Sequence, residues 1–128
     1  QCAVILAKLD RFDWEIAQRQ RIAQRYDQLL AESGVGLLTI RADRTSVYAQ
    51  YTIKVSSRDA LQKRLADSGI PSAVHYPLPL NEQPAYKNLC CSDCTPISHQ
   101  MAKQVMSLPM GPDLSTRDQD RIVSALLS

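Results

Sequence analysis

The chain has 128 residues and a formal net charge of +2, and 45% of its residues are hydrophobic and 22% charged. These values are typical of a single globular domain with a modest core. The small net charge gives no reason to expect nucleic acid or a membrane as partner, because both attract concentrated basic surfaces, and no apolar run approaches the ~20 residues that cross a bilayer.

The first predicted element is one long amphipathic helix over residues 2–32, which makes residues 1–33 a linking helix. Its apolar side chains recur every three or four residues, and Gly34 and Gly36 follow its end. Because the helical pattern is already under way at Gln1, without an N-cap or a signal peptide, we expect the chain to be a fragment. The side chains expected to face inward are Ile5, Leu9, Phe12, Ile16, Ala23, Tyr26 and Leu30.

Strands and a short helix are predicted in the middle of the chain. Residues 37–40 form a possible strand, and residues 45–55 a firmer one, because apolar and polar side chains alternate there. Ser57 is expected to cap a helix of about ten residues that ends at Gly69. Its predicted core residues are Leu61 and Leu65.

The last third is predicted to contain a strand, two helices and an extended step. The strand covers residues 70–75, the first helix 98–106 and the extended step 107–110, and Ser115 caps the second helix. The inward residues of that helix are expected to be Ile122, Val123, Leu126 and Leu127. This order predicts an α+β fold in which helices cover a small, mainly antiparallel sheet.

A histidine and a tyrosine stand side by side where the strand at 70–75 should end. Pro77 follows directly, and proline restricts both its own φ and the conformation of the residue before it. His75 and Tyr76 should therefore lie on a stiff turn, where binding a ligand costs little conformational entropy. Such a pair can equally be structural, and the residues alone leave both interpretations open.

The cysteines could suggest a zinc or redox site, since Cys90, Cys91 and Cys94 precede His99. A structural zinc site usually needs two ligand pairs, and a thioredoxin-type motif begins a helix after a strand. Neither arrangement is evident here. We therefore expect a polar surface loop with reduced thiols and no metal, as in a cytoplasmic protein.

Motifs for several common reactions are missing from the sequence. It contains no glycine-framed serine, no P-loop and no glycine-rich dinucleotide fingerprint, and no lysine in a setting that suggests Schiff-base chemistry. The chain by itself is therefore not expected to hold a reaction centre.

Seven short strings follow one another along the chain in a characteristic order. They are QCAVILAKL at 1–9, RY at 25–26, SVYAQYT at 46–52, GIP at 69–71, HYP at 75–77, QPAY at 83–86 and MSLPM at 106–110. In this order they resemble the DegT-type sugar-nucleotide aminotransferases, which are pyridoxal-phosphate enzymes of fold type I. The resemblance covers nearly the whole chain and corresponds to the C-terminal small domain, residues 1–128, with the long helix that leads into it.

The resemblance implies a division of roles between this chain and the rest of the enzyme. The cofactor-binding lysine, the aspartate on the pyridinium nitrogen and the stacking aromatic belong to a large domain absent here. No catalytic or cofactor-binding residue is therefore expected in the chain, and pyridoxal 5'-phosphate is not expected to bind it. His75 and Tyr76 correspond to residues that contact the sugar in the partner subunit of a homodimer, whereas Asn81 and Gln83 are expected only to support them.

The resemblance also implies a reaction. An amino group would pass from glutamate to a 3-keto UDP-sugar, a 2-acetamido-3-oxo uronic acid, for bacterial O-antigen and lipopolysaccharide biosynthesis. His75 and Tyr76 would orient the sugar by hydrogen bonds. A non-catalytic ligand-sensing module or a dimerisation module remains the alternative, and the coding sequence upstream of Gln1 would distinguish them.

Overall fold

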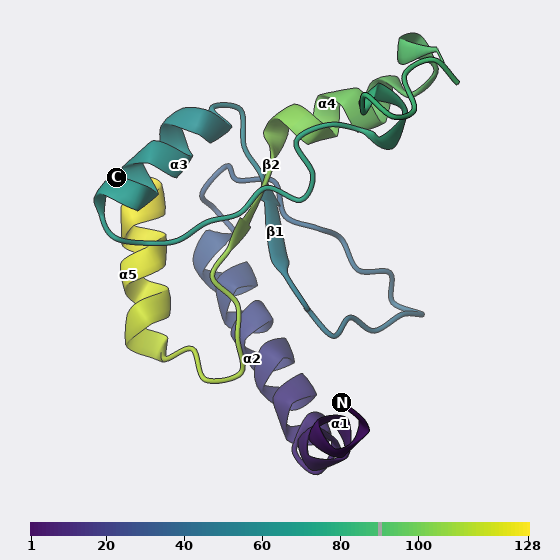
Figure 1. The fold of residues 1–128 in the computed structure, drawn as a ribbon. Coiled ribbons are helices and arrows are strands. Elements are labelled where there is room, and N and C mark those ends of the chain that lie inside the picture. The colour runs from purple at the N-terminus through teal and green to yellow at the C-terminus, as the bar shows by residue number, and fades with distance from the viewer. Residues whose placement is uncertain (90) are drawn as a thin grey trace.

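The computed structural model describes residues 1–89 and 91–128. Helices dominate the chain and a two-stranded sheet lies near its centre (Figure 1). The elements in chain order are α1 (Cys2–Leu9), α2 (Phe12–Leu30), β1 (Tyr51–Lys54), α3 (Arg58–Asp67), the 3-10 turns η1 (Leu80–Glu82) and η2 (Ser92–Cys94), α4 (Pro96–Gln104), β2 (Val105–Leu108) and α5 (Thr116–Leu127). The predicted α+β class is confirmed.

The sheet pairs β1 with β2 in antiparallel register, with Thr52 opposite Ser107. A single bridge extends it on each side, from Gly36 to Lys54 and from Ala73 to Ser107. The predicted strands at 37–40 and 70–75 are therefore wrong as strands, because the first segment contains no bridge and the second contains only the one at Ala73. The predicted antiparallel character of the sheet is confirmed.

The predicted strand at 45–55 is confirmed only in its second half. Tyr48 has a φ of +45°, which breaks the extended conformation before β1 begins. Side chains of α2 bind this irregular segment, because Arg19 Nη1 donates to the Tyr48 carbonyl at 3.2 Å and Gln20 Nε2 to the Ser46 carbonyl at 3.2 Å. These bonds satisfy carbonyls that a sheet neighbour would otherwise have to satisfy.

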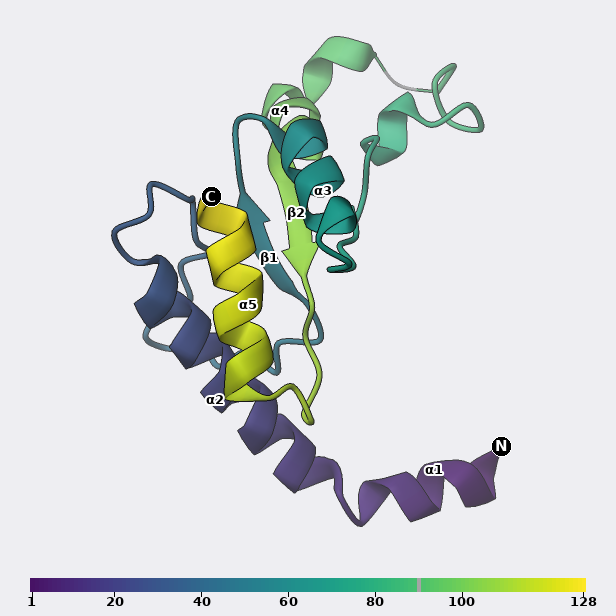
Figure 2. The ribbon, with the colours of Figure 1, turned by 90° about the vertical axis from the view of Figure 1, so that its left-hand side faces the viewer.

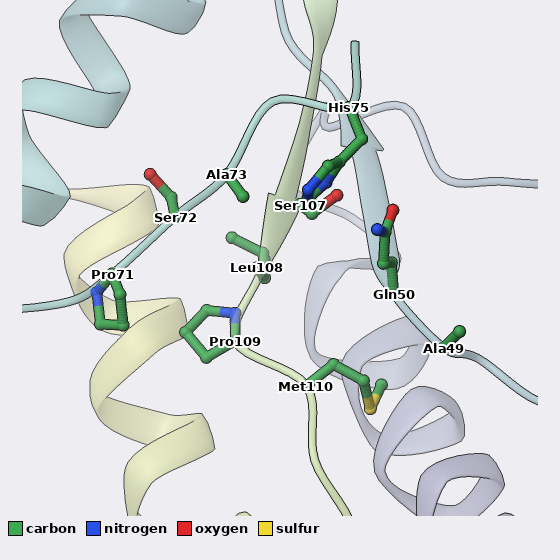
Figure 3. Close-up of a pocket in the computed structure, with 10 residues that line it drawn as sticks. All are labelled: Ala49, Gln50, Pro71, Ser72, Ala73, His75, Ser107, Leu108, Pro109 and Met110. Atoms are coloured by element: carbon green, nitrogen blue, oxygen red, sulfur yellow. The ribbon is translucent and has the colours of Figure 1, made fainter. Parts of the chain in front are cut away.

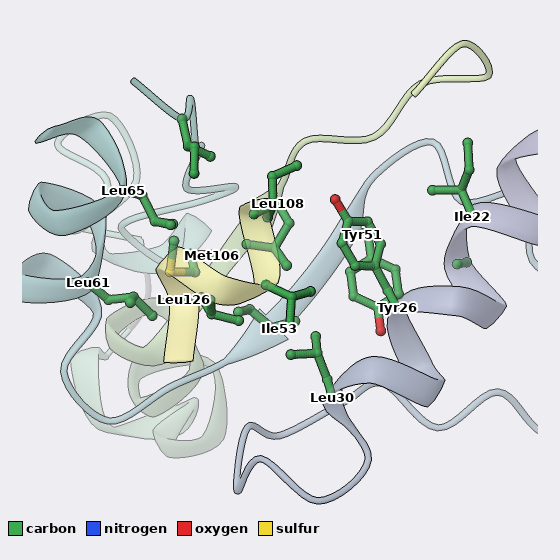
Figure 4. Close-up of a cluster of buried hydrophobic side chains, with 14 residues drawn as sticks. Ile22, Tyr26, Leu30, Tyr51, Ile53, Leu61, Leu65, Met106, Leu108 and Leu126 are labelled. Atoms are coloured by element: carbon green, nitrogen blue, oxygen red, sulfur yellow. The ribbon is translucent and has the colours of Figure 1, made fainter. Parts of the chain in front are cut away.

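The core lies between one face of the sheet and the helices α2, α3 and α5 (Figures 2 and 4). The Tyr26 and Tyr51 rings pack with centroids 4.7 Å apart, and the Tyr26 hydroxyl donates to the Pro109 carbonyl at 3.0 Å. Buried Gln119 donates from Nε2 to the Ile22 carbonyl at 3.0 Å, which joins α5 to α2. The buried apolar residues of this cluster are Ile22, Ala23, Tyr26, Leu30, Tyr51, Ile53, Leu61, Leu65, Ile70, Met106, Leu108, Ile122, Val123 and Leu126.

The predicted single helix over residues 2–32 is wrong, because it is divided at Asp10 and Arg11 into α1 and α2. The chain changes direction there (Figure 2), and the Arg11 guanidinium lies 4.7 Å from the centroid of the Trp14 ring. No residue of α1 is buried, so no core packing holds α1 in line with α2. Three residues predicted to face inward are exposed instead, namely Ile5, Leu9 and Phe12.

The ends of the helices agree with the sequence in part. Ser115 caps α5, since its Oγ accepts from the Asp118 amide at 3.1 Å, whereas the expected cap Ser57 makes no such bond at α3. Gly69 ends α3 as predicted, with a φ of +69°. The last residue predicted for the core of α5, Leu127, is half exposed, which corrects that expectation.

Residues 77–89 and 91–104 form an arm that projects from the body and contains η1, η2 and α4 (Figure 1). The helix predicted at 98–106 is shifted, because α4 begins at Pro96 and residues 105 and 106 belong to β2. Within the described residues, no helix is long and apolar enough to cross a membrane.

Candidate functional site

His75 lines a shallow pocket of about 220 Å³ beside the sheet (Figure 3). Three segments far apart in sequence meet there, namely the residues before β1, the residues after α3, and β2 with its extension. The lining residues are Ala49, Gln50, Pro71, Ser72, Ala73, His75, Ser107, Leu108, Pro109 and Met110.

A backbone bridge fixes the position of His75. The Ser107 amide donates to the Ala73 carbonyl at 2.7 Å, and the Ala73 amide donates to the Ser107 carbonyl at 3.2 Å. The bridge holds Ala73 against β2, and His75, two residues further on, lines the same pocket as Ala73. The next peptide bond, between His75 and Tyr76, is cis.

The structure brings His75 to the pocket but leaves Tyr76 outside its lining. The two rings meet edge to face, with centroids 5.8 Å apart, and the Tyr76 side chain is 70% exposed. Within residues 1–89 and 91–128, neither side chain forms a hydrogen bond. Both polar groups can therefore bind a ligand that approaches from solvent.

Two polar residues of the pocket were not singled out from the sequence. Gln50 lies just before β1, and Ser107 is buried on β2, where its Oγ lies 3.0 Å from the Thr52 Oγ1. The alternation of apolar and polar residues over 45–55 already indicated where Gln50 lies, since it places Gln50 and Thr52 on the same, polar face of the predicted strand. The register that brings Ser107 opposite Thr52 is a tertiary feature, which the sequence did not provide.

Apart from His75, the residues lining the pocket carry no ionisable side chain. Pyridoxal phosphate needs an amine for its aldehyde and usually cations or backbone amides for its phosphate. The pocket offers no lysine or arginine, so it does not fit that cofactor. It is suited instead to uncharged groups that donate and accept hydrogen bonds.

The arm holds Asn81 through hydrogen bonds of its own. Asn81 Nδ2 donates to the Cys91 carbonyl at 3.2 Å, and its Oδ1 accepts from Thr95 Oγ1 at 3.0 Å. Nearby, His99 Nδ1 lies 2.6 Å from the Glu82 carboxylate. Asn81 thus lies within the arm's own network and connects the turn after His75 to the start of α4.

The structure contradicts the expectation of reduced thiols for one pair. Cys91 and Cys94 form a disulfide, because the turn η2 brings their Cα atoms to 5.7 Å, a separation that a disulfide can span. Cys90 lies outside the described residues. In the part of the chain that the structure describes, no three histidine, cysteine or acidic side chains are grouped to hold a metal ion.

Comparison with known proteins identifies the family to which the chain belongs. Residues 1–127 match the DegT/DnrJ/EryC1/StrS aminotransferase family, and the chain belongs to that family. Among its curated relatives is UDP-2-acetamido-2-deoxy-3-oxo-D-glucuronate aminotransferase of Pseudomonas aeruginosa, which is 44% identical over 126 residues. That match covers 98% of this chain and 34% of the relative.

Solved structures agree with the family assignment. The chain superposes on a DegT/DnrJ/EryC1/StrS aminotransferase from Brucella abortus with a TM-score of 0.92 and 38% identity. It superposes on DesV of S. venezuelae, solved in complex with a ketimine intermediate, with a TM-score of 0.94 and 32% identity. Both matches cover 98% of this chain and 34% of the other.

A candidate sugar aminotransferase from Streptococcus pneumoniae, solved in a PLP-form, matches with a TM-score of 0.84 and 31% identity over 95% of this chain and 33% of its own. The chain therefore spans about a third of the length of the relatives it matches.

Proposed function

We propose that this chain is the C-terminal small domain of a pyridoxal-phosphate-dependent aminotransferase that acts on a nucleotide sugar. Family membership supports the aminotransferase activity, and the relative solved in a PLP-form supports the cofactor. The cofactor and the catalytic lysine belong to the part of the protein outside this chain, in keeping with a pocket that offers no lysine.

The proposed reaction transfers an amino group from glutamate to a 3-keto UDP-sugar, a 2-acetamido-3-oxo uronic acid. The name of the Pseudomonas aeruginosa relative, at 44% identity, supports this choice of substrate. The product would serve bacterial O-antigen and lipopolysaccharide biosynthesis in the cytoplasm. We propose that the enzyme is a homodimer with no nucleic acid or membrane partner.

Within this enzyme, His75 and Tyr76 bind the sugar. The observation that carries this proposal is the position of His75 at an open pocket whose other lining groups are uncharged. Ligand pockets usually enclose ~300–1,000 Å³, and this one encloses about 220 Å³. The chain therefore supplies one wall of a site that another part of the protein, or its partner subunit, completes.

The test replaces the two residues in the full-length protein. His75→Ala or Tyr76→Phe should lower kcat/KM for the sugar roughly threefold to a hundredfold, because each removes a hydrogen bond that contributes about 0.5–1.5 kcal/mol, and more with a charged partner. The half-reaction with glutamate should stay nearly unchanged, since the proposal assigns both residues to the sugar and neither to the cofactor. Stopped-flow absorbance of each half-reaction separates the two effects.

His99→Ala is the matched control, because His99 lies on the arm, away from the pocket, and pairs with Glu82. It should leave kcat/KM for the sugar within about twofold of the parent. If the His75 and Tyr76 variants instead lose thermal stability and impair both half-reactions together, the pair is structural. A full-length protein without a lysine-bound cofactor would favour a ligand-sensing or dimerisation module.

A further inference from the structure

The register of the sheet places a row of polar side chains on the face opposite the core. Tyr51 and Ile53 of β1 are buried in the core, so Thr52 and, one step earlier, Gln50 point to the other face. Ser107 stands opposite Thr52, and its Oγ lies 3.0 Å from the Thr52 hydroxyl. Figure 3 shows the His75 ring beside Ser107 and the Gln50 side chain on the neighbouring segment that leads into β1.

Of these side chains, Gln50 is free to bind a ligand. Ser107 and Thr52 already share a hydrogen bond, whereas the Gln50 side chain is exposed and bonds no group in the described parts of the chain. No hydrogen bond joins it to His75. Its amide can therefore both donate and accept toward a molecule in the pocket.

The backbone that carries Gln50 is held in place from α2. The Arg19 guanidinium donates from Nη1 to the Tyr48 carbonyl at 3.2 Å and to the Ala49 carbonyl at 3.4 Å. On the other side, β1 begins at Tyr51, whose ring is buried. Gln50 is thus fixed at both ends, so binding a ligand orders little more than its own side chain.

The pocket favours a neutral ligand group. This chain contributes no lysine or arginine to the pocket that could pair with the charged carboxylate of a uronic acid. An acetamido group is uncharged, and its N–H and C=O can pair with the C=O and N–H of a glutamine side chain in two reciprocal hydrogen bonds. Beside Gln50, Ala49 contributes only a methyl group to the lining of the pocket.

We propose that Gln50 is a specificity-determining residue that binds the 2-acetamido group of the sugar and selects it against a 2-hydroxyl. This inference rests on the proposed function and specifies which substituent of the substrate the pocket recognises. His75 and Tyr76 hold the sugar, and Gln50 distinguishes which substituent it carries.

The test compares two substrates in the full-length enzyme, the 3-keto UDP-sugar with a 2-acetamido group and its analogue with a 2-hydroxyl. Gln50→Leu keeps the side-chain size but removes both hydrogen bonds, so kcat/KM for the acetamido sugar should fall about tenfold or more. The value for the hydroxyl analogue should change less than about threefold. The ratio of the two values measures the selectivity.

Two further variants make the result decisive. Gln50→Glu keeps the acceptor but removes the amide donor and adds charge, so it should also reduce the preference for the acetamido sugar, even if the leucine variant fails to fold. Gln28→Leu removes an exposed glutamine of α2 that lies outside the pocket, and it should leave both values unchanged. The glutamate half-reaction serves as the measure of a folded, loaded enzyme for every variant.

The outcomes separate this inference from the function on which it rests. If the parent enzyme aminates the acetamido sugar but both Gln50 variants keep its selectivity, the role of Gln50 is overturned and the proposed function stands. If the parent enzyme aminates neither sugar, the proposed function fails and the inference fails with it.

Discussion

Two tyrosines in the core illustrate how single residues couple this fold to pH. The Tyr51 hydroxyl donates to the Asp27 carboxylate at 2.7 Å, and the Tyr26 hydroxyl to the Pro109 carbonyl at 3.0 Å. Burial raises the pKa of both tyrosines above its ordinary value, and the hydrogen bond to Asp27 raises that of Tyr51 further. Arg25 offsets a part of the effect of burial on the pKa of Tyr26.

The raised pKa of both tyrosines predicts a loss of stability in alkali. In the unfolded chain a tyrosine titrates near pH 10, whereas in the folded chain both keep their protons to higher pH. The contribution of the two protonated tyrosines to the free energy of unfolding is therefore complete below about pH 10. Above that pH the free energy of unfolding falls, by up to about 1.4 kcal/mol per pH unit for each tyrosine. Urea denaturation of the chain between pH 8 and 11 measures this slope.

The double variant Tyr26→Phe/Tyr51→Phe provides the comparison. It should be less stable at neutral pH, because two hydrogen bonds are lost, but its free energy of unfolding should fall less steeply above about pH 10. Tyr86→Phe, at an exposed tyrosine of the arm, should keep the steeper slope. Equal slopes for all three proteins would show that the core tyrosines do not control the alkaline transition.

Among the single residues of the pocket, the sequence indicated His75 as a candidate binding residue but did not single out Gln50. His75 stands out because it is one of two histidines and lies two residues before Pro77, and the structure places it at the pocket. Gln50 belongs to an alternating run whose polar face looks like ordinary solvent-exposed strand. Only the bridge between Ala73 and Ser107, a contact between distant segments, brings that face beside His75.

Among the helices, α5 and α3 differ in how their N-termini are capped. Ser115 Oγ accepts from the Asp118 amide at 3.1 Å, and its hydroxyl donates to the Asp118 carboxylate at 2.6 Å. Ser57 occupies the same position at α3 without a side-chain capping bond. The same residue type thus stands at two helix starts with different roles, which makes a matched pair for an experiment.

The caps predict unequal effects of the same substitution. Ser115→Ala should lower the free energy of unfolding by about 1 kcal/mol, because an amide of the first turn loses its acceptor. Ser57→Ala should change it by less than about 0.5 kcal/mol, as is usual for surface substitutions. Thermal denaturation of the two variants measures the difference, and equal losses would contradict a capping role specific to Ser115.

The end of α3 depends on a glycine. Gly69 has a φ of +69°, a backbone conformation that residues other than glycine rarely adopt. Its amide donates to the Ala66 carbonyl at 2.8 Å. Gly69→Ala should therefore destabilise the chain by about 1 kcal/mol.

Gly111→Ala is the control for that substitution, because Gly111 has no positive φ and a Cβ added there would meet nothing within 4 Å. It should be neutral or slightly stabilising, since alanine restricts the unfolded chain. Chemical denaturation of the two variants compares them directly. A loss at Gly111 as large as that at Gly69 would indicate that backbone conformation is not the cause.

The predicted elements differ in accuracy for a physical reason. The helices α3 and α5 are specified locally, by periodic apolar residues between capping or terminating residues. The strands are not, because an alternating run needs a neighbour to become a strand. Residues 45–50 have side chains of α2 as that neighbour, so they adopt an irregular path with Tyr48 at positive φ.

The helical pattern near the N-terminus predicts that one face of the helix is buried, but it does not indicate which part of the molecule covers that face. The apolar side chains of α1 and the start of α2 are exposed in this chain, among them Val4, Ile5, Leu6, Leu9, Phe12 and Trp14. Periodicity reports only that a face is apolar. Periodicity also gave no sign of the break at Asp10, because the break arises where no residue of α1 is buried and no core packing holds α1 in line with α2.

The proposed assembly makes a prediction that only a pair of subunits can test. If His75 acts in the site of the partner subunit, each site combines the lysine of one subunit with the His75 of the other. We therefore expect that mixing a full-length variant without the catalytic lysine with a His75→Ala variant restores activity. One site of each mixed dimer then has both residues, which gives about a quarter of the parent activity after random exchange of equal amounts.

The two parents must be shown to be folded, dimeric and able to exchange subunits, for example by native mass spectrometry of the mixture. Each parent alone should remain at its own low level, because none of its sites has both residues. Activity that stays at the average of the two parents, although mixed dimers have formed, would place His75 in the site of its own subunit or in no site. The lysine-deficient variant mixed with a Gly111→Ala variant is the control, since every lysine-bearing site there keeps its His75.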